Sequence, residues 1–164
     1  MIPEIKKILY TTDLSETSNF AFSYAASLAN RYDAVISIFH VLKDALPTSE
    51  NLVSNVLGEE KWKELLDRNK TEIVEKIRRR LEDFCEETKA ALPSCPFMME
   101  EVIIKIGNPV EEIIREVDNN DYDMVVMGAH GQGAIANAVM GSVSRRVVRR
   151  CRTPVLVIRL PMVG

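Results

Sequence analysis

Hydrophobic residues are concentrated in five short runs, at 5–10, 34–42, 98–106, 124–127 and 155–158, and polar or turn-forming segments separate them. The runs are four to nine residues long and rich in β-branched side chains, which is typical of strands. The run at 34–42 is apolar at nearly every position, which indicates a strand buried on both faces of a parallel sheet. The pattern therefore predicts five strands.

The segments between these runs show the spacing of amphipathic helices. In the first of them a possible capping residue, Ser15, precedes apolar residues at i, i+3, i+4 and i+7, namely Ala21, Tyr24, Ala25 and Leu28. Further helices are expected at 60–91, after the capping residue Asn108, and at 142–151. The segment 43–59 is less regular, and we expect it to form a loop with some helix.

This alternation of strands and helices predicts the fold class. We expect an α/β domain with a doubly wound, five-stranded parallel sheet, right-handed crossovers and helices on both faces. A length of 164 residues with 46% hydrophobic composition suits a single domain, 1–164, with its own core. In such sheets a ligand binds at the carboxyl ends of the strands, near the point where the strand order reverses.

The charge distribution excludes some partners. The net charge is −3 and both signs are interspersed, which argues against a surface devoted to nucleic acid or to anionic lipid. The exception is a cluster of arginines at Arg145, Arg146, Arg149, Arg150 and Arg152. We interpret it as a solvated helix face, although Arg145 or Arg146 is also placed to reach a bound phosphate. With no membrane-spanning run and no signal peptide in the sequence, we expect a cytoplasmic protein.

The cysteines and histidines give no sign of a metal site. Cys85, Cys95 and Cys151 are odd in number and lack C-x-x-C spacing, so we expect reduced, mostly buried thiols. His40 and His130 lack the paired spacing of metal ligands, and a structural role is expected for both.

A glycine motif with the spacing G-x-x-G-x9-G-S follows the fourth predicted strand and precedes the last predicted helix. Its members are Gly128, Gly131, Gly141 and Ser142. A polyphosphate that lies against backbone needs residues without a Cβ, and the start of a helix offers unsatisfied N–H groups to an anion. Ser142 and Ser144 would add hydroxyl donors. The alternative is that the glycines only form a turn and that Ser142 only caps the helix.

Three more segments accompany this motif: KILYTTD at 7–13, GNP at 107–109 and TPVLVI at 153–158. In this order, along nearly the whole chain, the pieces resemble the universal stress protein family, and in particular its ATP-binding subclass. The resemblance implies the strand order 3-2-1-4-5. It also implies an adenine nucleotide such as ATP as ligand, with Mg²⁺ or Mn²⁺ held mainly by the phosphates, and a homodimer formed through the last strand, Val155–Ile158.

The same resemblance assigns site residues. The adenosine end would contact Asp13 and Val41, and the glycine loop would lie along the ribose and phosphates. The phosphates would be held by Gly141, Ser142, Val143 and Ser144, and the full set also includes Thr11, Thr12, Met127, Gly128, His130 and Gly131. Thr11 stands where many relatives have proline, but this position contributes mainly backbone shape, so we expect binding to survive. Asp13 has an alternative role as the cap of the turn that follows it, and the additional Gly133 is expected to loosen the loop.

No motif for catalysis is found in the sequence. The P-loop pattern G-x-x-x-x-G-K-[ST], the dinucleotide pattern G-x-G-x-x-G and the elbow G-x-S-x-G are all missing from it. We therefore expect a stress-response protein that binds ATP and signals its nucleotide state to an unidentified protein partner, with at most weak ATPase activity. The alternatives are a slow ATP hydrolase or adenylate-forming enzyme that uses the same pocket, or a nucleotide-free scaffold or chaperone-like protein.

Overall fold

The strands and helices alternate as predicted in the computed structural model, which describes residues 1–43, 58–131 and 140–161. In chain order they are β1 (Lys7–Thr12), α1 (Glu16–Tyr32), β2 (Val35–Lys43), α3 (Glu59–Ala91), β3 (Met98–Gly107), α4 (Pro109–Asn119), β4 (Met124–Gly128), α5 (Ser142–Arg150) and β5 (Val155–Ile158). Of the segment 43–59, expected to form a loop with some helix, residues 44–57 lie outside the described residues, as does the additional glycine, Gly133. At its ends, Lys43 belongs to β2 and Glu59 to α3.

The sheet has five strands in the order β3-β2-β1-β4-β5, and every neighbouring pair is parallel. This confirms the single α/β domain and the strand order 3-2-1-4-5. The order reverses at β1, which pairs with β2 on one side and with β4 on the other. The loops that leave β1 and β4 therefore meet at one edge of the sheet, where ligands bind in this class of fold.

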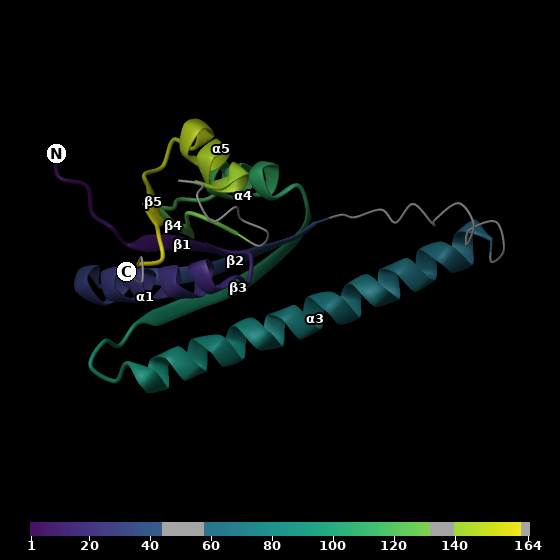
Figure 1. Ribbon diagram of the computed structural model, residues 1–164, viewed down its shortest axis with the longest axis horizontal. Coiled ribbons are helices and arrows are strands. Elements are labelled where there is room, and N and C mark those ends of the chain that lie inside the picture. Colours follow the sequence, from purple (N-terminus) through teal and green to yellow (C-terminus); the bar gives the residue numbers. More distant parts are fainter. Residues whose placement is uncertain (44–57, 132–139, 162–164) are drawn as a thin grey trace.

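Two apolar cores separate the sheet from its helices (Figure 1). On one face α1 and α3 cover the sheet, through side chains that include Phe22 and Leu81. On the other face α4 and α5 cover it, through side chains that include Ile113 and Val147. Successive strand residues alternate between the cores, so Ile8 and Tyr10 contribute to the first and Leu9 to the second. Among the described residues, no helix combines the length and the apolarity that a membrane span requires.

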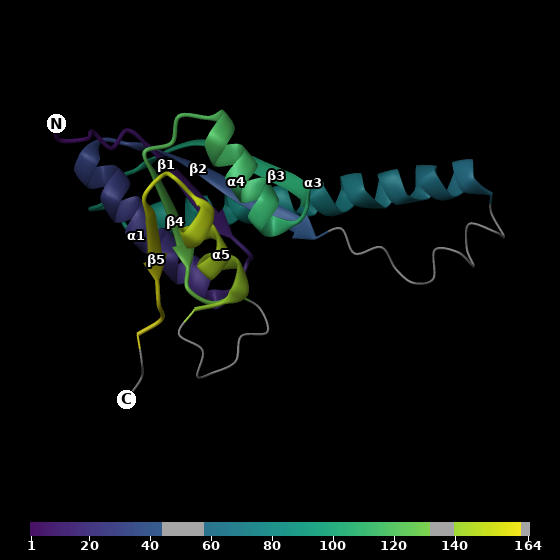
Figure 2. The same ribbon diagram turned by 90° about the horizontal axis from the view of Figure 1, so that it is seen from above.

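Helix α3 is a single helix of 33 residues, as its periodicity predicts. It runs well beyond the sheet in both ribbon views (Figures 1 and 2). Its C-terminal half makes the core contacts, through Leu81 and Cys85, which are buried, and through Ile77 and Phe84, which pack against the same core. Ile73, two turns before Leu81, is 44% exposed. Among the side chains of α3 that the structure describes, those packed in the core therefore belong to its C-terminal half.

The helix starts follow the predicted local chemistry. Ser15 caps α1, where its hydroxyl accepts a hydrogen bond from the Ser18 N–H. Asn108 caps α4 through the N–H groups of Val110 and Glu111, and a proline occupies the first turn. Both caps are local features, since the partner N–H groups lie two or three residues away.

Several expectations need correction. The first strand is Lys7–Thr12 rather than 5–10, and Thr11 and Thr12 extend it because β-branched side chains suit a pleated strand and both residues pair with β2. Tyr24 is 45% exposed instead of facing the core. Of the three free thiols only Cys85 is buried, whereas Cys95 and Cys151 are partly exposed, and Cys151 follows α5 as its cap.

Candidate functional site

The turn between β1 and α1 is held by its own polar side chains. Asp13 Oδ1 accepts a hydrogen bond of 3.0 Å from the Ser15 N–H. Thr12 Oγ1 accepts one of 3.0 Å from the Leu14 N–H and lies 2.8 Å from Ser18 Oγ. Leu14 has a φ of 67°, in the left-handed region that non-glycine residues seldom adopt. The turn is thus a fixed and locally strained structure that determines where the Asp13 carboxylate lies.

Buried hydrogen bonds from side chains of β1 and β2 hold this turn in place. His40 is 7% exposed, and its Nδ1 lies 2.7 Å from the carbonyl oxygen of Thr12. The Tyr10 hydroxyl donates a hydrogen bond of 2.6 Å to the carbonyl oxygen of Ser18, and burial raises the pKa of this phenol well above its usual value. The structural role predicted for His40 agrees with this position, because it joins the end of β1 to β2.

The glycines after β4 pack closely against this turn. A Cβ on Gly128 would lie 3.1 Å from Thr17 Cγ2 and 3.2 Å from the Ser18 nitrogen, in the first turn of α1. A Cβ on Gly131 would overlap Asp13 Oδ2. Neither glycine has a left-handed φ, so their lack of a side chain serves close approach rather than an unusual backbone conformation. The structure therefore brings Asp13 and Gly131 together, as expected if β1 and β4 are neighbours.

A set of short hydrogen bonds fixes both described ends of the glycine loop. The Gly141 N–H donates to the carbonyl oxygen of Ala129 over 2.6 Å, and the Ala129 N–H donates to Ile158 in β5 over 2.7 Å. Ser144 Oγ lies 2.7 Å from the same Ala129 oxygen. The Ser144 side chain is buried, so its hydroxyl ties α5 to β4, whereas Ser142 is exposed.

The N-termini of α4 and α5 differ in their capping. Helix α4 has the side chain of Asn108 on its first N–H groups and two acidic residues, Glu111 and Glu112, in its first turn. Helix α5 begins after Gly141 with neither a side-chain cap nor an acidic residue in its first turn. Since the first N–H groups of a helix have no partner within the helix, the start of α5 is the better anion site of the two.

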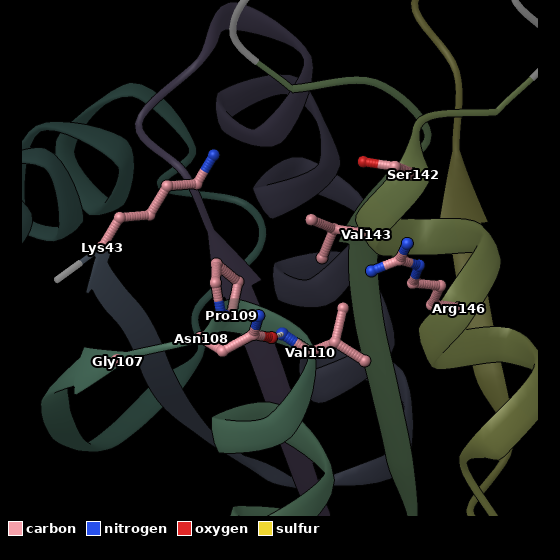
Figure 3. Close-up of a pocket in the computed structure, with 8 residues that line it drawn as sticks. All are labelled: Lys43, Gly107, Asn108, Pro109, Val110, Ser142, Val143 and Arg146. Atoms are coloured by element: carbon pink, nitrogen blue, oxygen red, sulfur yellow. Dashed lines mark hydrogen bonds between the residues drawn. The ribbon is translucent and has the colours of Figure 1, made fainter. Parts of the chain in front are cut away.

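A pocket of about 570 Å³ lies between these two helix starts (Figure 3). This volume is within the range of roughly 300–1,000 Å³ that is usual for small-molecule sites. Its lining residues are Lys43, Gly107, Asn108, Pro109, Val110, Ser142, Val143 and Arg146. Lys43 and Arg146 approach it from opposite sides, and the Ser142 hydroxyl points toward the open space.

The predicted site residues do not all line the same pocket. Ser142 and Val143 line the pocket, and Asp13 and Gly131 meet at the neighbouring turn. Val41 and Met127 belong to the apolar core beneath α4 and α5. Thr11 and Thr12 are each only 6% exposed, and His130 is partly exposed beside Gly131.

Several lining residues were not among the predicted site residues, namely Lys43, Gly107, Asn108, Pro109 and Val110. The sequence did contain a signal for them, because Lys43 ends β2 and Gly107 ends β3, and the carboxyl ends of parallel strands share one edge of the sheet. Across residues 1–43, 58–131 and 140–161, no group of three or more His, Cys, Asp or Glu side chains is placed to hold a metal ion.

Comparison with known proteins identifies the family. The model of the universal stress protein family matches residues 4–159. The universal stress protein MJ0577 of Methanocaldococcus jannaschii is 27% identical over 154 residues, which cover 94% of each chain. A solved structure of MJ0577 has a TM-score of 0.74 and 28% identity, with coverage of 98% of this chain and 99% of that one.

Two more distant structures share the fold and have adenine nucleotides bound. A universal stress protein in complex with cAMP has a TM-score of 0.59 and 22% identity, over 95% of this chain and 98% of that one. The Arabidopsis thaliana protein At3g01520, with AMP bound, has a TM-score of 0.55 and 18% identity, over 95% and 92%. Since the family model matches the chain from β1 to β5, the chain belongs to the universal stress protein family.

Proposed function

We propose that this chain, over residues 1–164, is an ATP-binding universal stress protein of the cytoplasm. In this proposal its nucleotide state is passed to a protein partner, and hydrolysis is at most slow. The phosphates carry a Mg²⁺ or Mn²⁺ ion as they bind. This is a binding function, and it requires only that the site bind adenosine at one end and a polyphosphate at the other.

The observation that carries the proposal is the start of α5. This helix has no side-chain cap, and its residues Ser142 and Val143 line the pocket. An anion there would complete the hydrogen bonding of the first turn and interact favourably with the helix dipole. The adenine nucleotides bound to the two more distant structures support an adenine nucleotide as that anion.

The remaining site residues receive roles by position. Asp13 and Val41, with Thr11, Thr12 and Met127 behind them, would define the adenosine end. Gly128, His130 and Gly131 would lie along the ribose and the first phosphate. Gly141–Ser144 would hold the outer phosphates through backbone N–H groups and the Ser142 hydroxyl. The buried hydroxyl of Ser144, which bonds to Ala129, would act by holding this segment in place.

A dimer through β5 is also part of the proposal. Strand β5 lies at the edge of the sheet, and its residues Val155, Leu156 and Val157 are only partly buried. An apolar edge strand of this kind pairs readily with a second copy, most simply about a two-fold axis. Light scattering of the purified protein tests this part, since a monomer at micromolar concentration would reject it.

The experiment for ATP binding uses a variant that blocks the start of α5 without harming the fold. Ser142→Glu places a carboxylate where the phosphate is proposed to lie, and an acidic residue in the first helical turn is favourable for stability. Ser27→Glu, at an exposed position of α1, is the control with the same change of charge. ATP with Mg²⁺ is titrated into each protein by calorimetry, and the melting temperature is measured alongside.

We expect wild type and Ser27→Glu to bind ATP alike. In Ser142→Glu the affinity should fall by at least about tenfold, because the introduced carboxylate repels the phosphates and occupies the N–H groups. Its melting temperature should equal or exceed that of wild type. Equal ATP affinity in all three proteins would reject the start of α5 as the phosphate site.

A further inference from the structure

The arginines of α5 are not equivalent. Arg150 donates to both carboxylate oxygens of Glu111 in α4, and this pairing lowers the pKa of the Glu111 carboxyl. Arg149 is exposed and does not line the pocket. Arg146 does line the pocket, and within the described parts of the chain it forms no ion pair with a carboxylate.

The position of Arg146 directs its side chain toward the start of α5. It is four residues, or about one turn, beyond Ser142, so both lie on the same face of the helix. Side chains on a helix lean toward its N-terminus. Figure 3 shows the guanidinium on the pocket side of α5, next to Val143. An anion bound to the first turn of α5 would therefore lie close to this guanidinium.

Lys43 supplies a second cation from another element. It is the last residue of β2 and lies across the pocket from Arg146, with its amino group directed toward the open space (Figure 3). The two acidic residues in the first turn of α4 offset these charges little, because Glu111 is paired with Arg150 and Glu112 with Arg115. The pocket thus has two cations on its walls and an uncapped helix start between them.

We propose that Lys43 and Arg146 make this site selective for nucleotides with a polyphosphate chain over nucleoside monophosphates. The proposal rests on the proposed adenine-nucleotide function and adds to it which class of nucleotide is preferred. Each additional phosphoryl group brings more negative charge and more acceptor oxygens. Arg146 can bind two of these oxygens at once through its planar guanidinium, while Lys43 acts as a point charge. The single phosphate of a nucleoside monophosphate would lie beside Gly131 and not on the first turn of α5. It would therefore leave Lys43 and Arg146 without an anionic partner.

The test compares ATP, ADP and AMP, each titrated by calorimetry into wild type, Arg146→Ala, Arg146→Lys and Lys43→Ala. Arg149→Ala is the matched control, because it removes the same charge from the same helix outside the pocket. We expect wild type to bind ATP more tightly than AMP. Arg146→Ala should lower the affinity for ATP by about tenfold and change the affinity for AMP by less than about twofold. Arg146→Lys should recover part of the loss, and Lys43→Ala should also lower the ratio of ATP to AMP affinity.

The salt dependence gives a second readout. Raising ionic strength should weaken ATP binding more steeply in wild type than in Arg146→Ala, because the removed interaction is between charges. An unchanged ratio of ATP to AMP affinity in Arg146→Ala and Lys43→Ala, with nucleotide still bound, would overturn this proposal and leave the proposed function intact. A loss in Arg149→Ala equal to that in Arg146→Ala would also overturn it. Absence of any nucleotide binding to wild type would overturn both.

Discussion

Ser144 in α5 donates a hydrogen bond of 2.7 Å to the carbonyl oxygen of Ala129, fifteen residues earlier. The same oxygen accepts the Gly141 N–H, so one carbonyl holds the start of α5 against the end of β4. This contact determines where the first turn of α5 lies relative to the glycine loop. It therefore links the stability of the fold to the geometry of the proposed phosphate site.

The first prediction concerns this contact. Ser144→Ala removes the buried hydroxyl while Gly141 still satisfies the Ala129 oxygen, so the free energy of unfolding should fall by about 1 kcal/mol. ATP affinity should fall as well, because the start of α5 is less well positioned. Urea denaturation and calorimetry measure the two effects. Ser142→Ala, at an exposed position, is the control for stability alone, and a loss of stability there as large as in Ser144→Ala would contradict this interpretation.

The second prediction concerns Asp13 and Gly131. A methyl group on Gly131 would overlap Asp13 Oδ2, so Gly131→Ala should displace the carboxylate and weaken ATP binding. In a protein that already carries Asp13→Ala, the same change should have a much smaller effect. A double-mutant cycle on ATP affinity should therefore give a coupling energy of at least about 0.5 kcal/mol. Strictly additive effects would show that the two residues act separately.

The third prediction concerns the thiol of Cys85. The residue is fully buried in the core between α1, α3 and the sheet, and burial is the main cause that raises its pKa. With Cys95→Ser and Cys151→Ser in place, the remaining Cys85 should react with a disulfide reagent only at the rate of unfolding or local opening of α3. Rapid labelling of the native protein would show that the C-terminal half of α3 is not held against the core.

The fourth prediction concerns acid pH. A hydrogen bond from Lys7, with a further contribution from Ser37, lowers the pKa of Glu100. A carboxyl with a lowered folded-state pKa contributes stability that is full above its unfolded pKa of about 4.3 and is lost as pH falls through the folded pKa. Glu100→Gln should therefore reduce stability at pH 7 and make the loss below about pH 4 shallower.

The size of this effect is limited by exposure. The Glu100 side chain is 43% exposed, so water and salt screen the pair and the loss at pH 7 should be below about 1 kcal/mol. Denaturation at a series of pH values measures it. The matched variant Glu101→Gln removes the adjacent carboxyl of β3 without touching the Lys7 pair. An identical pH profile for the two variants would contradict the assigned role of the pair.

Features set by neighbouring residues could be predicted from the sequence. Ser15 and Asn108 cap their helices as expected, because the capped N–H groups follow within three residues. The single helix at α3 follows from one long periodic pattern. Tyr24 shows the limit of such patterns. Helical spacing identifies an apolar stripe, but it does not determine where the sheet lies beneath it, and Tyr24 is at the exposed border of its stripe.

The candidate site was predicted only in part, for a physical reason. The glycine motif could be read locally, and its proximity to Asp13 followed from the strand order. The strand ends place Lys43 and Asn108 at the same edge of the sheet, but their position across the pocket from Arg146 depends on how α4 and α5 pack on the sheet, which no local pattern shows. The internal hydrogen bond of Ser144 was also beyond sequence reasoning, since its partner is the carbonyl oxygen of Ala129, which lies just after β4 and fifteen residues earlier in the chain.

The central claim is that this site binds an adenine nucleotide, and titration of ATP and GTP with Mg²⁺ into wild type and Gly131→Val tests it most directly. The valine side chain would overlap Asp13 and distort the glycine loop. We expect saturable binding of ATP to wild type, weaker binding of GTP, and loss of ATP binding in Gly131→Val while the far-ultraviolet circular dichroism stays that of an α/β fold. No binding of ATP to wild type, in protein shown to be free of retained nucleotide by mass spectrometry, would contradict the account.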